Sequence, residues 1–120
     1  MNNKPKIAFI QFPGSNTENE TIATIERNNM IAVPHFWNDP FSQLRACDGY
    51  VILGGFSYED RSRSGIIASL DPIMEEVKKA IALGKPVLGI CNGAQILVES
   101  GIVPGNESFG TIASLTQNKR

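Results

Sequence analysis

Four short apolar segments that alternate with helical patterns constrain the fold of this chain more than any other feature. They are predicted strands at residues 6–12, 31–36, 50–53 and 86–90. A continuous apolar run such as Ile7–Ile10 is typical of a strand that is buried on both faces. Short apolar strands separated by helices favour a parallel sheet with helices on both sides. The sequence therefore predicts an α/β fold.

Helix signals occupy the intervals between these strands. Thr17 and Glu20 have the spacing of a capping box, which predicts a helix that begins there. Asp71 is a good N-cap because Pro72 follows it, and Gly84 suits the position just past the end of that helix. The predicted helices span residues 17–29, 41–45 and 72–83, with a last one that runs from the turn at Cys91 to about residue 100, while residues 56–66 are predicted to form a polar loop.

The segment Gly89-Ile90-Cys91-Asn92-Gly93 carries the clearest chemical signal. A thiol between two glycines at a strand-to-helix turn is typical of a nucleophile elbow, and bulky side chains at either glycine would collide with the turn. The following helix N-terminus favours the reactive thiolate form of Cys91. The pattern predicts acyl transfer through a thioester. The alternative is a buried structural cysteine, which is the interpretation we prefer for Cys47.

Gly54-Gly55 follows the third predicted strand and offers a partner for the elbow. Attack of a thiolate on an amide creates an oxyanion that needs N–H donors. The backbone of Asn92 is the first candidate donor and that of Gly55 is the second, although the glycines could equally form an ordinary bend. Both segments follow strands of a predicted parallel sheet, so we expect them to meet at one crevice.

Composition excludes several classes of protein. The chain has 120 residues, 42% apolar and 19% charged, with a net charge of −1. These values predict one globular domain and argue against a protein that wraps nucleic acid. The longest apolar runs have about five residues, too short to cross a bilayer, and two cysteines form no disulfide framework, so we expect a cytoplasmic protein. The only histidine, His35, is predicted to be a packed or surface residue rather than a catalytic base.

Four separated blocks together resemble a known family. The chain is similar to class I (triad-type) glutamine amidotransferases and, among them, to the glutaminase subunits of phosphoribosylformylglycinamidine synthase, an enzyme of purine biosynthesis. The resemblance extends from residue 6 to about 104. It implies a flavodoxin-like three-layer α/β/α sandwich with a mostly parallel sheet. The blocks that carry it are Phe12–Asn16, Gly54–Tyr58 with Asp60, Ser69–Met74 and Gly84–Leu97.

The resemblance implies an activity and residues for it. Cys91 matches the nucleophile that attacks the side-chain amide of glutamine and releases ammonia, while Gly55 and Asn92 match the backbone oxyanion donors. Gln95 matches a residue that contacts the bound glutamine, and the remaining candidates for lining the substrate site are Gly54, Phe56 and Ser57. The ammonia would pass to a large synthetase subunit, often accompanied by a small third subunit. ATP and Mg²⁺ would belong to that synthetase, so we expect neither a cofactor nor a metal on this chain.

One departure from the family pattern affects the expected activity. Family members place the catalytic His and its Glu partner downstream of the region matched here, whereas this sequence ends at Arg120. We therefore expect residues 1–120 to be the N-terminal portion of a single amidotransferase domain without its C-terminal segment, with little turnover alone. An unpaired sheet edge would favour self-association. Three alternatives stay open: another class I amidotransferase, a non-catalytic flavodoxin-like module with a redox-sensing cysteine, and a cysteine hydrolase.

Overall fold

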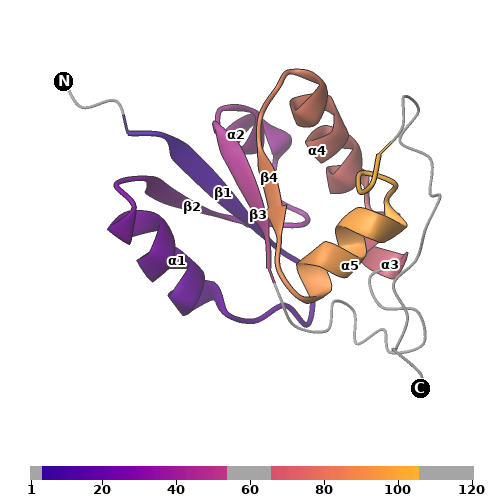
Figure 1. Cartoon of the computed structure of the whole chain (residues 1–120), viewed down its shortest axis with the longest axis horizontal. Coiled ribbons are helices and arrows are strands. Elements are labelled where there is room, and N and C mark those ends of the chain that lie inside the picture. Colours follow the sequence, from indigo (N-terminus) through magenta and orange to yellow (C-terminus); the bar gives the residue numbers. More distant parts are fainter. Residues whose placement is uncertain (1–3, 54–65, 106–120) are drawn as a thin grey trace.

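The computed structural model describes residues 4–53 and 66–105 of the chain, and the strands of this part form one sheet. All strand pairs are parallel, and the strand order is β2-β1-β3-β4 (Figure 1). This order is the flavodoxin-like one, and the predicted α/β fold is confirmed. The elements in chain order are β1 Lys6–Gln11, α1 Glu18–Arg27, β2 Ile31–Phe36, α2 Phe41–Arg45, β3 Gly49–Ile52, α3 Ile66–Ser69, α4 Pro72–Ala82, β4 Val87–Gly89 and α5 Asn92–Glu99.

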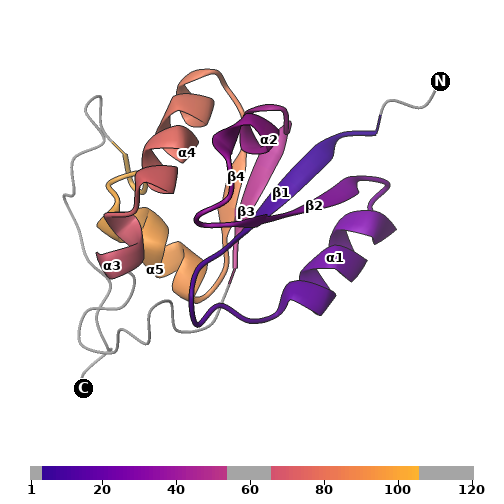
Figure 2. The same ribbon diagram turned by 180° about the vertical axis from the view of Figure 1, so that it is seen from behind.

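Side chains of the strands alternate between two apolar layers. On one side, Ala8, Ile10 and Ile52 join residues of α2, α4 and α5 in the larger core cluster. On the other side, Phe9 and Val51 pack with Ile22 and Ile25 of α1. Figures 1 and 2 show α1 on one side of the sheet and the remaining labelled helices on the opposite side. The described residues thus form three layers, with the sheet in the middle.

The helix boundaries follow local signals with one correction. Asp71 caps α4 as predicted, because its Oδ1 accepts a hydrogen bond from the Ile73 N–H at 3.1 Å. Gly84 follows that helix with φ of +87°. The capping box predicted at Thr17 is wrong: this residue has φ of 71°, and its side chain makes no cap hydrogen bond to α1. The Thr17 hydroxyl instead donates to the carbonyl of Asn16.

Two further expectations differ from the structure. The short helix α3 was not predicted, because its four residues show no helical period. The strand at 86–90 was expected to be buried, yet Leu88 is 56% exposed and Ile90 is 55% exposed. Among the described residues, α1 is the helix on that side of the sheet, and it packs against β1 and β2. The apolar side of β4 that faces the α1 layer is therefore open in the described part of the chain. The predicted polar loop lies almost wholly outside the described residues.

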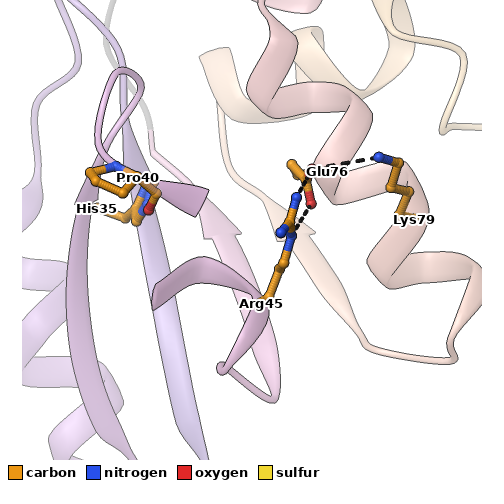
Figure 3. A network of polar contacts seen from close by, with 5 residues as sticks. All are labelled: His35, Pro40, Arg45, Glu76 and Lys79. Atoms are coloured by element: carbon orange, nitrogen blue, oxygen red, sulfur yellow. Dashed lines mark hydrogen bonds and ion pairs between the residues drawn. The ribbon is translucent and has the colours of Figure 1, made fainter. Parts of the chain in front are cut away.

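An ion pair joins α2 to α4 on the other side of the sheet (Figure 3). Glu76 is only 8% exposed, and Arg45 holds it in a bidentate contact, with Nη2 to Oε1 at 2.8 Å and Nε to Oε2 at 3.0 Å. The hydrogen bonds from Arg45 lower the pKa of the Glu76 carboxyl, although burial opposes this effect. The Lys79 ammonium lies 3.6 Å from Oε1.

No helix in residues 4–53 and 66–105 is long and apolar enough to cross a membrane.

Candidate active site

Cys91 lies in the tight turn between β4 and α5. Its backbone has φ of 58° and ψ of −115°, and it is one of three non-glycine residues with positive φ among those described. Such a conformation is costly and persists only where the surroundings impose it, which is typical of functional turns. The residue is exposed. The turn therefore presents the thiol at the surface, next to the N-terminus of α5.

The flanking glycines are required by close packing. A Cβ atom at Gly93 would lie 2.0 Å from the carbonyl oxygen of Ile52 in β3. A Cβ atom at Gly89 would lie 2.6 Å from Leu97 Cδ1 and 2.7 Å from the backbone of Gly93. The steric reason predicted for the two glycines is thus confirmed. Because neither glycine carries a side chain, α5 packs directly against the ends of β3 and β4. This packing fixes the position of Cys91.

The first turn of α5 carries the other described site candidates. The Asn92 side chain is 1% exposed, and its Nδ2 donates a hydrogen bond to Gln95 Oε1 at 2.9 Å. The Gln95 side chain is half-buried, and the backbone N–H of Gln95 donates to the Cys91 carbonyl at 3.2 Å. Because backbone N–H groups in a first turn point out of the helix end, they lie on the side where Cys91 is presented. The sequence indicated Asn92 only for its backbone, and the side-chain contact with Gln95 was missed, although a spacing of three on one helix face could have suggested it.

The second predicted oxyanion donor cannot be placed. Gly54, Gly55, Phe56 and Ser57 lie outside the described residues. The end of β3, which is described, lies beside the elbow, since the Ile90 N–H donates to the Ile52 carbonyl at 3.4 Å. The carboxyl ends of β1, β3 and β4 also meet at one edge of the sheet. The strand ends that the structure describes therefore converge as predicted. The position of Gly54 and Gly55 stays a prediction.

His35 is far from the elbow and is fully buried. Its Nε2 donates to the carbonyl of Pro40 at 3.0 Å. Figure 3 labels both residues. The residue lies in β2, and two strands separate β2 from β4. With about 4.8 Å between neighbouring strands, the separation is roughly 14 Å. His35 therefore does not reach Cys91, and the prediction of a packed histidine is confirmed.

The second cysteine has the opposite environment. Cys47 is 2% exposed, and its Sγ lies 3.5 Å from the Gln43 carbonyl in a weak hydrogen bond. Burial raises the pKa of the Cys47 thiol, which keeps it in the unreactive protonated form. The structural role predicted for Cys47 is confirmed. Within the described ranges, no group of three or more His, Cys, Asp or Glu residues is placed to hold a metal ion.

Comparisons with known proteins give one family and several relatives. Residues 4–120 match the family described as the CobB/CobQ-like glutamine amidotransferase domain. The chain is 50% identical over 113 residues to phosphoribosylformylglycinamidine synthase subunit PurQ of Methanothrix thermoacetophila, with 94% of this chain and 42% of the relative covered. It is 45% identical over 100 residues to the PurQ subunit of Pyrococcus furiosus, with 83% of this chain and 44% of that protein covered.

A solved structure shows the same fold. The structure of PurLQS from Thermotoga maritima has a TM-score of 0.74 and 34% sequence identity to this chain. The similarity covers 82% of this chain and 45% of that one. The chain thus spans less than half the length of the relatives that it matches.

Proposed function

This chain belongs to the CobB/CobQ-like glutamine amidotransferase family, and on that premise we propose that it forms the nucleophile-bearing part of a phosphoribosylformylglycinamidine synthase glutaminase subunit. The observation that carries the proposal is the elbow. Cys91 is exposed at positive φ between two glycines that close packing requires. The two curated relatives reported above are named as PurQ subunits of this enzyme.

The proposed reaction begins with the Cys91 thiolate. Its sulfur attacks the side-chain carboxamide carbon of glutamine and forms a tetrahedral oxyanion. The backbone N–H groups of Asn92 and Gly55 stabilise that negative charge. The C–N bond then breaks, the nitrogen takes a proton and leaves as ammonia, and a γ-glutamyl thioester remains on Cys91. Water attacks the thioester, which releases glutamate and restores the thiol.

The substrate is held by residues around the elbow. Because Gln95 Oε1 accepts a hydrogen bond from Asn92, the amide NH₂ group of Gln95 points away from Asn92 and can donate to another group. We assign Gln95 to binding the acceptor oxygens of the glutamine substrate, one helical turn after the nucleophile. Gly54, Phe56 and Ser57 are proposed to line the same pocket.

Proton transfer requires a group that the described residues do not provide. The only histidine of the chain, His35, is buried in β2. Three strand spacings, roughly 14 Å, separate β2 from β4. Loss of the base in cysteine and serine hydrolases typically costs several powers of ten in rate. We therefore propose that these 120 residues alone turn over little glutamine and that activity needs the remainder of the longer relatives.

The product ammonia points to a partner. Ammonia is incorporated into a product by an enzyme that activates an acceptor, and the curated relatives are named as subunits of a synthase. We propose that this chain delivers ammonia to an ATP-dependent synthetase subunit, which holds the ATP and Mg²⁺, with a small third subunit in the assembly. The similarity to the PurLQS structure supports an assembly of this kind.

A chimera tests the proposed function. This chain replaces the matched 113 residues of the Methanothrix thermoacetophila PurQ relative, and ammonia release from glutamine is measured with the synthetase subunit of that organism present. We expect turnover in the chimera and none after Cys91→Ala, with Cys47→Ala as the matched control that retains it. Turnover that survives Cys91→Ala would contradict the proposal. A folded chimera whose Cys91 is oxidised by peroxide yet releases no ammonia would favour a redox sensor instead.

A further inference from the structure

The side chain of Asn92 is a buried amide at the start of α5 that the oxyanion role does not explain. It is 1% exposed, and its Nδ2 donates a hydrogen bond to Gln95 Oε1 at 2.9 Å. Burying an amide costs free energy unless it forms hydrogen bonds, whereas a backbone N–H can donate whatever side chain its residue carries. An apolar side chain would therefore serve the backbone of Asn92 equally well. The buried amide calls for a second role, and the hydrogen bond to Gln95 identifies one.

This hydrogen bond fixes which end of the Gln95 amide is available to other groups. A glutamine amide has an oxygen that accepts and an NH₂ group that donates, and rotation about its last bond exchanges the two. Because Asn92 offers an NH₂ group, a reversed Gln95 amide would bring two donors together and lose the hydrogen bond. The contact therefore holds the Gln95 oxygen toward Asn92 and leaves the Gln95 NH₂ group for another acceptor.

The contact is made on a closely packed turn beside the nucleophile. The backbone N–H of Gln95 donates to the Cys91 carbonyl at 3.2 Å, and residues four apart lie on one face of a helical turn. A Cβ atom at Gly93, which lies between Asn92 and Gln95, would be 2.0 Å from the Ile52 carbonyl oxygen. The first turn of α5 is thus held against β3. Asn92 anchors Gln95 from the interior, on a turn that also carries the exposed Cys91.

We propose that the Asn92 side chain is a positioning residue for the glutamine substrate and that it acts through Gln95. By holding the Gln95 oxygen, it directs the Gln95 NH₂ group to oxygen atoms of the bound glutamine that take no part in the reaction. The inference rests on the proposed function, which assigns Gln95 to substrate binding. Loss of such a contact weakens the ground state and the transition state alike. It therefore raises KM for glutamine and leaves kcat nearly unchanged.

Steady-state ammonia release by the chimera, with the synthetase subunit present, tests the positioning role. We expect Asn92→Ala to raise KM for glutamine at least about fivefold, because one hydrogen bond that orients a binding group is lost, and to change kcat by less than about threefold. Asn28→Ala is the matched control. It removes an exposed amide at the end of α1 whose Nδ2 donates to the Thr24 carbonyl at 2.8 Å, and it should leave KM unchanged within about twofold.

A double-mutant cycle separates positioning from a structural role. In a Gln95→Ala background, Asn92→Ala should change KM by less than about twofold, since the side chain that it orients is already absent. If Asn92→Ala does not fold by circular dichroism, Asn92→Ser takes its place in the cycle, because its short hydroxyl keeps a polar group at this position without reaching Gln95.

Three outcomes would overturn the inference. An unchanged KM in the single Asn92 variant would show that the contact does not serve binding. The same fold-increase in KM with and without the Gln95 side chain would show a structural role. A fall in kcat with constant KM would place the effect at the oxyanion turn.

The parent chimera distinguishes this inference from the proposed function. If it releases no ammonia, the glutamine concentration that half-protects Cys91 from iodoacetamide replaces KM in the same cycle. A parent with neither turnover nor protection would contradict the proposed function, and the inference would fall with it. A parent that binds glutamine, with Asn92 variants that bind it equally well, would contradict the positioning role alone.

Discussion

Substitution of Gly93 by alanine is expected to destabilise the chain strongly, because the elbow leaves no room for a methyl group at this position. The new methyl group would lie 2.0 Å from the Ile52 carbonyl oxygen and 2.8 Å from its carbon. A carbon and an oxygen in van der Waals contact are about 3.3 Å apart, so α5 must retreat from β3 by more than about 1 Å. That shift separates Ile96, which is fully buried, from the core. Overpacking typically costs about 1–3 kcal/mol and occasionally more, and a 2.0 Å contact with backbone places Gly93→Ala at the upper end of that range or above it. Up to about 1 kcal/mol of this cost is offset by the better helix propensity of alanine.

Gly84→Ala is the matched control for this prediction. Gly84 has φ of +87°, and a Cβ atom there would meet nothing within 4 Å. Its cost is the left-handed backbone penalty alone, about 1–2 kcal/mol. Urea unfolding followed by circular dichroism gives the free energy of unfolding of each variant. We expect Gly93→Ala to lose clearly more stability than Gly84→Ala, and a Gly93→Ala loss equal to or smaller than the control would refute the packing at the elbow.

Three further predictions concern other positions. Asp71→Ala should cost about 1 kcal/mol of unfolding free energy in the same assay, while Asp71→Ser retains most of it, because serine also caps helices; equal losses would argue against the cap. The pKa of Glu76 is lowered from its ordinary value of 4.5 by Arg45, so its contribution is present above that pH and is lost as pH falls through the lower folded-state pKa. The difference in thermal midpoint between the wild type and Glu76→Gln should therefore narrow on acidification, and a constant difference would show that the pair does not titrate in this way. Iodoacetamide should alkylate the exposed Cys91 at least about tenfold faster than the buried Cys47 in peptide mapping, and equal rates would contradict the two environments.

The sequence predicts those parts of the fold that depend on local rules. The bounds of α2 and the cap of α4 follow from turn and capping residues in their own segments. Thr17 has the right spacing for a capping box, but its backbone is left-handed, so the hydroxyl cannot reach the helix. The exposure of Leu88 was missed for a different reason. A run of apolar residues indicates a strand that prefers burial, but whether a second layer covers it depends on residues far away or in another segment.

The candidate site also combines features that the sequence predicts with features that it does not. Cys91 could be located from sequence because the glycines at 89 and 93 meet a steric requirement, which the backbone of Ile52 and the side chain of Leu97 explain. The hydrogen bond between Asn92 and Gln95 could not be predicted with equal force, because it depends on side-chain rotamers. The role of Gly55 stays a prediction, since that residue lies outside the described ranges.

Competition between a diazo-ketone analogue of glutamine and glutamine itself tests the central claim most directly. Intact protein is incubated with the analogue, and the alkylated cysteine is identified by peptide mass spectrometry. Because the structure exposes Cys91 at the start of α5, we predict alkylation at Cys91 that glutamine slows and asparagine does not, with Cys47 unlabelled. Labelling of Cys91 at the same rate with and without glutamine would contradict the assignment of a glutamine site to this elbow.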